Sequence, residues 1–426
     1  MLLIALVFVF AYALIALEHP IKINKSAIAL MAAGLMWTLY GVFSPDGIHH
    51  VGAQLTEKLA ETAAIVFFLM AAMTIVEVTD AHGGFEVVTN RIRARSLRSL
   101  LWVIGLITFF LSAILDNMTT TIVMVTLMRK LLKDDRQRLL FAGIIVIAAN
   151  AGGAWSPIGD VTTTMLWIGG QITTLPIVKA LLLPALAALA VPLVAASLFL
   201  RGPAVPPEAT ENDDAPATSA SEKTLMFCLG MGALLFVPAF KTVTHLPPWL
   251  GILFALGVVW AAGEILHRNK SDEEKEHLTL AKALRRIDMP SVIFFIGILL
   301  AVAVMSANGQ LPALAAWLGQ HIQSQALIVM VIGLVSAVVD NIPLVAAAMG
   351  MYPLGQYPAD SFIWEFLAYC AGTGGSLLII GSAAGVAAMG LEKIRFFWYV
   401  RNVSLLALLG YFAGAAAYIL QYRLLH

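Results

Sequence analysis

Charged residues are scarce in this chain of 426 residues. They make up only 12% of the sequence, whereas a soluble domain has about a quarter. The 26 Lys and Arg balance the 26 Asp and Glu without forming a basic stripe, so nucleic acid is not expected as a partner. Only two cysteines occur, Cys228 and Cys370. Both lie in apolar runs, which favours buried thiols over a disulfide or a metal site.

The sequence also lacks the motifs of an enzyme. The glycine-rich stretch GTGGSLLIIG at 372–381 does not end in the Gly-Lys-Ser/Thr of a phosphate-binding loop. No catalytic nucleophile and no cluster of metal ligands stands out. We therefore expect neither an enzyme nor a cofactor.

Long apolar runs are abundant instead. Hydrophobic residues make up 60% of the chain and the mean hydropathy is +0.87, which indicates an all-α polytopic membrane protein in contact with lipid. The runs predict about ten full spans, of which 139–168 and 362–390 are broken by glycine-rich polar stretches. The other predicted spans are 2–17, 27–43, 62–79, 180–200, 223–240, 249–266, 291–306 and 398–421.

Two further segments, 99–128 and 324–352, carry Asp-Asn in their middle. The first has Lys and Arg on both flanks, and the second has none on either flank. Because positive charge marks the cytoplasmic side, the first should enter from the cytoplasm and the second from outside. Neither segment is long enough for two crossings of about 20 residues, so each is predicted to be a re-entrant hairpin.

The same order of elements occurs twice along the chain. SAILDNMTTT at 112–121 aligns without gaps to SAVVDNIPLV at 336–345. GGAWSPIGD at 152–160 likewise matches GGSLLIIGS at 374–382. Five crossings in the first half invert the second half, so we predict two inverted-topology repeats, each with a re-entrant hairpin and a broken helix.

This pattern divides the chain into three parts. The first repeat covers 1–200 and contains spans 1–5, and the second covers 224–426 and contains spans 6–10. A linker at 201–223, rich in Pro, Ala and Ser, joins them. The linker and the charged loop 267–290 are both predicted to be cytoplasmic.

Helix breaks at matching positions of inverted repeats are typical of secondary transporters, whose site lies where the breaks meet. Oxygen atoms at such breaks suit a small hard cation such as Na⁺. Buried carboxylates there can take up either the cation or a proton, so the two compete. The predicted cation- and proton-binding residues are Asp116, Asn117, Thr119, Asn150, Ser156, Asp160, Thr162, Asp340, Asn341, Thr373 and Ser376.

Glycine and proline are expected to hold the breaks open, because they favour unwound backbone or interrupt a helix. These residues are Gly152, Gly153, Pro157, Pro343, Gly374 and Gly375. The aspartates have a second interpretation as N-caps of the half-helices, a position that Asp favours. Two more residues are candidates for a proton path or for pH sensing. Glu77 lies near the end of a span, and His82 follows it, with a solvated loop position as the alternative for His82.

Two long motifs, SAILDNMTTTIVMVTLMRKLL and ANAGGAWSPIGDVTTTMLWIGGQI, closely resemble the NhaD-type sodium/proton antiporters of the ion transporter superfamily. The resemblance covers nearly the whole chain and is strongest over 62–170 and 291–400. It implies a homodimer in a bacterial inner membrane that expels Na⁺, and often Li⁺, in exchange for external H⁺.

The two halves differ in their polar residues. The second break lacks an acid, and Pro343 stands where the first tip has Thr119. Most Na⁺ ligands are therefore expected in the first half, at Asp116, Asn117, Ser156 and Asp160.

Two alternatives remain open. The first is a Na⁺- or H⁺-coupled di- or tricarboxylate transporter of the same superfamily, which resembles this architecture but tends to carry neutral tips. Here both tips carry Asp, and no Lys or Arg is evident within the predicted membrane segments to offset them, which favours cation exchange. The second alternative is a channel, which would need a continuous open pore.

Overall fold

We describe the fold from a computed structural model of the chain. It describes residues 2–45, 47–89, 92, 94, 96–204, 218–268, 270–271, 275, 278–322, 324–338 and 340–425. The middle of the predicted linker, residues 205–217, and part of the predicted loop 267–290 lie outside these residues.

Secondary structure in the described part of the chain is helical, apart from one isolated bridge between Ser96 and Pro203. The helices of the first half are α1 (Leu2–Ala16), α2 (Glu18–Ile21), α3 (Lys25–Phe43), α4 (Ile48–Ala81), α5 (Glu86–Thr89), α6 (Leu97–Ser112), α7 (Asn117–Leu131), α8 (Asp135–Ala154), α9 (Val161–Ile168) and α10 (Thr174–Phe199). Those of the second half are α11 (Ala220–Thr244), α12 (Pro248–His267), α14 (Leu280–Arg286), α15 (Met289–Ala307), α16 (Gln310–His321), α17 (Gln325–Val335), α18 (Asn341–Met351), α19 (Phe362–Gly374), α20 (Ala383–Glu392), α21 (Phe396–Asn402) and α22 (Ser404–Leu425).

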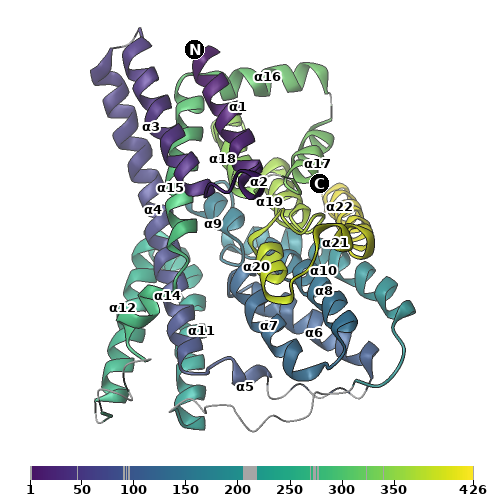
Figure 1. Cartoon of the computed structure of the whole chain (residues 1–426). Helices are drawn as coiled ribbons and strands as arrows, with labels where there is room; N and C mark the ends of the chain where they lie inside the picture. Colours follow the sequence, from purple (N-terminus) through teal and green to yellow (C-terminus); the bar gives the residue numbers. More distant parts are fainter. Residues whose placement is uncertain are drawn as a thin grey trace.

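The helices form two groups (Figure 1). Helices α3, α4, α11, α12 and α15 stand together on the left of the view, and α6, α7, α8, α10 and α22 pack together on the right. The short helices α9 and α18 lie between the groups. Helix α9 contacts α4 of the first group and α8 of the second. Helix α18 contacts α15 of the first group and also α19, which packs on α8 and α10 of the second.

Eight of the described helices are long and apolar enough to cross a membrane: α3, α4, α8, α10, α11, α12, α15 and α22. Helix α1 is apolar but shorter, and the predicted span 362–390 is divided between α19 and α20. Large apolar side chains such as Phe199 and Val243 are more than three-quarters exposed, as expected of a surface that faces lipid. The chain is therefore a multi-pass membrane protein.

The breaks fall where the sequence predicts them. Helix α6 ends at Ser112 and α7 begins at Asn117, while α17 ends at Val335 and α18 begins at Asn341. The predicted broken spans are also divided, α8 from α9 and α19 from α20. Polar residues interrupt the apolar run in all four places. They can supply hydrogen-bond partners to the N–H and C=O groups that a buried helix end leaves free.

Glycine has a different role from the predicted one. Gly152, Gly153 and Gly374 are helical residues rather than parts of an unwound segment. A Cβ atom on Gly152 would lie 2.2 Å from the carbonyl oxygen of Phe109, and one on Gly374 would lie 2.0 Å from that of Gly333. The glycines therefore let α8 and α19 pack closely against α6 and α17.

The three remaining predicted breakers do not all behave alike. Pro157 lies in the non-helical stretch between α8 and α9, and Gly375 caps the end of α19, both as expected. Pro343, in contrast, is the third residue of α18 and does not break it. Proline is tolerated there because the first N–H groups of a helix have no partner within the helix.

Candidate functional site

Asp116 caps the N-terminus of α7 at the first tip. One carboxylate oxygen accepts from the backbone N–H of Thr119 at 2.8 Å, and the other accepts from the Thr119 hydroxyl at 2.6 Å. The N-cap interpretation of Asp116 is thus confirmed. Each carboxylate oxygen of Asp116 still has a free lone pair after capping, so it can bind a cation or a proton.

Next to Asp116, the side chain of Asn117 joins the tip to the first broken helix. Its amide nitrogen donates to the Oδ1 atom of Asn150 and to the Oδ2 atom of Asp160, both at 2.9 Å. Asp160 caps α9, and its Oδ1 atom accepts from the N–H and the hydroxyl of Thr162, each at 3.0 Å. Asp160 and Asn150 are both buried, so a carboxylate and two amides share a site almost closed to solvent.

Asn150 carries this network into the second half of the chain. Its amide nitrogen donates to the hydroxyl oxygens of Ser376 and Ser382, both at 2.9 Å. Ser382 in turn caps α20 by accepting from the N–H of Gly385. The starts of α7, α9 and α20 are therefore connected by one set of hydrogen bonds.

A cavity of about 150 Å³ opens beside this network. Asp116, Asn117, Val161 and Ala383 line it, so it reaches the N-terminal ends of the same three helices. A cavity of this size can hold water. Glu77, Asp288 and Arg286 also line the cavity, which places two further carboxylates and one guanidinium near Asp116.

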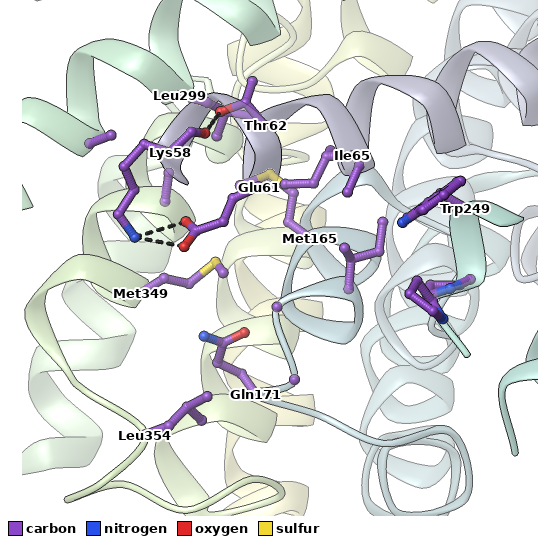
Figure 2. A pocket seen from close by; sticks show the side chains of 18 of the residues that line it. Lys58, Glu61, Thr62, Ile65, Met165, Gln171, Trp249, Leu299, Met349 and Leu354 are labelled. Atoms are coloured by element: carbon purple, nitrogen blue, oxygen red, sulfur yellow. Dashed lines mark hydrogen bonds and ion pairs between the residues drawn. The ribbon is translucent and has the colours of Figure 1, made fainter. Parts of the chain in front are cut away.

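A larger cavity of about 770 Å³ lies farther along α4 and α15 (Figure 2). An ion pair between Lys58 and Glu61 stands in its wall, with Gln171 and Met349 nearby. Residues of the hydrogen-bond network do not line this cavity.

Asp340, at the second tip, has surroundings unlike those of Asp116. It caps α18, with its Oδ1 atom 3.4 Å from the N–H of Ile342. Its Oδ2 atom is 2.9 Å from the ammonium of Lys25, the first residue of α3. The expectation that no Lys or Arg offsets the tip carboxylates is therefore wrong for Asp340.

The other predicted residues lie near the breaks without joining this network. Ser156 lies in the non-helical stretch after α8, where its hydroxyl accepts from the N–H of Ile158. The Thr373 hydroxyl donates back to the carbonyl oxygen of Tyr369 in its own helix. Asn341, the counterpart of Asn117, is buried as the first residue of α18.

His82 is buried, so a solvated loop position is wrong. Its Nδ1 atom is 2.6 Å from the carbonyl oxygen of Val78, and its Nε2 atom is 2.7 Å from the Nε2 atom of His267. Since a carbonyl only accepts, Nδ1 carries a proton, and a neutral His82 accepts at Nε2. Burial lowers the pKa of His82 below its usual value of 6.5.

Sequence reasoning missed several polar residues of the interior. Besides Lys25, they are Ser382, His267 and Glu365. Glu365 is buried in α19 and accepts a hydrogen bond from the Tyr418 hydroxyl at 2.8 Å. An acid inside a predicted membrane segment was a usable signal for Glu365. The expectation of buried cysteines holds for Cys370, whereas Cys228 is exposed.

A multi-pass helical protein with aspartates at its helix breaks, one of them buried, has the construction of a secondary transporter. Comparison with known proteins agrees. A family model described as a citrate transporter matches residues 12–372. Sodium/proton antiporter 1 of Arabidopsis thaliana is 50% identical to the chain, over 99% of this chain and 72% of the relative.

Bacterial relatives are similar over nearly their full length. The Na⁺/H⁺ antiporter NhaD of Vibrio cholerae is 33% identical over 97% of this chain and 90% of its own. That of Alkalimonas amylolytica is 30% identical over 97% and 89%. The chain belongs to the citrate transporter family and, within it, to the group that includes the NhaD-type antiporters. The resemblance found in the two long motifs is confirmed.

Proposed function

We infer that this protein exchanges cytoplasmic Na⁺, and also Li⁺, for external H⁺. The observation that carries the inference is the pair Asp116 and Asp160, which stand at linked helix breaks beside a cavity. Among the described residues, no Lys or Arg forms an ion pair with either of them. The relatives named as sodium/proton antiporters support the same assignment.

The chemistry follows from the cost of burying a charge. A buried carboxylate is stabilised either by binding a cation or by taking up a proton. Asp116, Asn117, Ser156 and Asp160 would supply oxygen ligands to Na⁺, and Thr119 and Thr162 hold the two carboxylates in place through their hydroxyls. When a proton binds the carboxylates, the site loses its negative charge and releases the cation. Competition for one site couples the two ions.

Alternating access is supported by the positions of the two cavities. The smaller cavity touches α4 at Phe68 and α15 at Phe295, whereas the larger touches them at Ile65 and Leu299. About one helical turn of side chains therefore separates them. We propose that this apolar layer and the carboxylate site move relative to each other, so that the site faces one cavity at a time. Glu77 would pass protons between the smaller cavity and Asp116.

We propose two inverted repeats, 1–200 and 224–426, and regard the pairs α6–α7 and α17–α18 as re-entrant hairpins. Matching contacts support this division. The Ser112 hydroxyl donates to the carbonyl oxygen of Ala149, and its counterpart Ser336 donates to that of Ala371. Helix α6 packs on α8 as α17 packs on α19, and α7 packs on α20 as α18 packs on α9.

The sidedness and assembly are part of the same proposal. We propose that the linker 201–223 and the loop 267–290 are cytoplasmic, since all but four of the Lys and Arg then lie on that side. The protein would reside in a bacterial inner membrane as a homodimer. Reporter fusions at the two loops and crosslinking in membranes would test these two points.

Carboxylate transport is the second candidate, because the matching family model is described as a citrate transporter. Two carboxylates at the first tip and first break would repel a carboxylate substrate. The only cation paired with a tip, Lys25 among the described residues, is already neutralised by Asp340. Cation exchange is therefore the better account of the site.

The test uses everted membrane vesicles from cells that lack their own antiporters. After energisation, NaCl, LiCl, KCl or citrate is added while a dye reports the pH gradient, from neutral to alkaline pH. Na⁺ and Li⁺ should collapse the gradient, and Asp116→Asn should abolish the effect. Asn caps a helix as well as Asp does, so this variant removes the charge and keeps the cap. Citrate uptake without any cation response would overturn the proposal.

A further inference from the structure

The two tips place an aspartate at the same point of the motif, yet the two carboxylates have different partners. Asp116 is held by the N–H and the hydroxyl of Thr119 and lines the smaller cavity. At the second tip Pro343 replaces this threonine, so the equivalent hydroxyl and N–H donors are missing. Asp340 is instead paired with the ammonium of Lys25.

Lys25 is well placed to hold this position. It is the first residue of α3, and its backbone N–H donates to a carboxylate oxygen of Glu18 at 3.1 Å. Its ammonium lies 2.9 Å from Asp340 and 4.4 Å above the ring centre of Phe294, on α15. A carboxylate on one side and an aromatic face on another are both favourable surroundings for a cation.

We propose that Lys25 occupies, as a permanent ammonium, the cation position that belongs to Asp340. Only the Asp116 tip then exchanges ions, and the second tip carries a fixed internal cation in place of a mobile one. This inference rests on the proposed antiport and adds one statement to it: the site takes up one Na⁺ per chain. Na⁺ cannot compete well with Lys25, because the ammonium is tethered to α3 and remains next to Asp340 when free ions leave.

The pair has a clear consequence for charge. Asp340 and Lys25 together are neutral, so the second tip with its paired lysine contributes no net charge to the site. Asp340→Asn alone would remove the only carboxylate that forms an ion pair with the ammonium among the described residues, with Glu18 and Asp288 acting on it from farther away. A partly buried ammonium without this partner is costly and repels an incoming cation. Lys25→Met would do the reverse and leave a free carboxylate that can bind a second Na⁺.

The first experiment measures the amount of radioactive Na⁺ bound per chain by the full-length protein in detergent at alkaline pH. We expect Lys25→Met to bind two Na⁺ where the unaltered protein binds one. Lys22→Met, which removes a lysine charge three residues earlier, should still bind one. An unchanged ratio in Lys25→Met overturns the proposal.

The second experiment measures exchange in vesicles at equal amounts of membrane protein. We expect Asp340→Asn to lower the exchange rate about tenfold or more, and Lys25→Met with Asp340→Asn to restore it to within about threefold. If the double variant is as inactive as Asp340→Asn, the Asp340 carboxylate itself carries cargo and the proposal fails. Full activity of Asp340→Asn alone would also contradict it. If the unaltered protein exchanges no cation, the antiport function fails before Lys25 is tested.

Discussion

Asn150 in α8 donates a hydrogen bond to the hydroxyl oxygen of Ser382, the residue that caps α20, at 2.9 Å. The two residues are 232 positions apart in the chain. This bond joins the first segment of the first broken helix to the start of α20, the second segment of the second broken helix. Because Asn150 also accepts from Asn117, one side chain joins the tip to both broken helices.

Asn150→Ala should destabilise the protein strongly. It removes one hydrogen bond each from Asn117, Ser376 and Ser382. A buried polar group left unsatisfied in this way costs about 1–3 kcal/mol. We expect a clear fall in Tm in detergent, together with weaker Na⁺ binding. Thr373→Val is the matched control, because the Thr373 hydroxyl bonds only within its own helix. Equal shifts of Tm in both variants would show that the network does not join the breaks.

Asp160→Asn removes one negative charge and keeps the cap of α9, because Asn caps a helix as well as Asp does. Its NH2 group cannot accept the hydrogen bond from Asn117, so the free energy of unfolding should fall by about 1–3 kcal/mol. The loss of one carboxylate should raise the half-saturating Na⁺ concentration by about tenfold or more, since a charged ligand is removed. Vesicle assays over a range of NaCl concentrations measure this.

The control for Asp160→Asn is Asp134→Asn, which alters the cap of α8 away from both cavities. It should leave the Na⁺ dependence unchanged. An unchanged Na⁺ dependence in Asp160→Asn itself would show that Asp160 is a helix cap and not a Na⁺ ligand.

Gly374→Ala tests the close packing of α19 on α17. The added Cβ atom would lie 2.0 Å from the carbonyl oxygen of Gly333, and relief of such an overlap costs about 1–3 kcal/mol or more. We expect a lower Tm and little exchange. Gly390→Ala in α20 is the control, since nothing lies within 4 Å of its Cβ position. Alanine there should be neutral or stabilise the helix by about 0.5–1 kcal/mol. Indistinguishable effects at the two positions would rule out the packing role.

The histidine pair predicts a dependence of stability on pH. Burial lowers the pKa of His82 from its usual 6.5, so the folded protein resists protonation. Such a group contributes stability above its unfolded pKa and loses it as the pH falls. Tm should therefore be level above about pH 6.5 and fall in more acidic buffer. Lys270, Glu222 and Glu264 also face the pair.

His82→Phe should weaken this acid sensitivity without abolishing it. The phenyl ring can still stack on His267 but takes up no proton, whereas the buried His267 can still be protonated. His321→Phe is the control, since His321 stacks on Trp317 at an exposed position. Should the acid-induced fall in Tm persist undiminished in His82→Phe, another group must be responsible for it.

The location of the four helix breaks was predictable, because it depends on local sequence. The helices end at or within the Asp-Asn and glycine-rich stretches that interrupt the apolar runs, although several helices are longer than the predicted spans, such as α4. The network residues Asn117, Asn150 and Ser376 were predicted from the same breaks. Ser382 was missed, although it occupies in the second half the position that Asp160 occupies in the first.

Partners between distant segments could not be predicted in this way. Lys25 resembled one more basic residue at the end of a span, and His82 resembled a residue of a solvated loop. Their partners, Asp340 and His267, are 315 and 185 positions away. Gly152 and Gly374 were predicted to unwind the chain, because a glycine needed for close packing cannot be told from a breaker by its neighbours.

The sequence by itself determined that this is a multi-pass helical membrane protein with polar breaks, and it identified the family. Hydropathy and helix breaks arise from neighbouring residues, so they can be read without a fold. The tertiary structure alone decided which aspartate is paired with a lysine and which is open to a cavity. That outcome depends on how helices from both halves pack, and the same residue type at equivalent positions therefore has different surroundings.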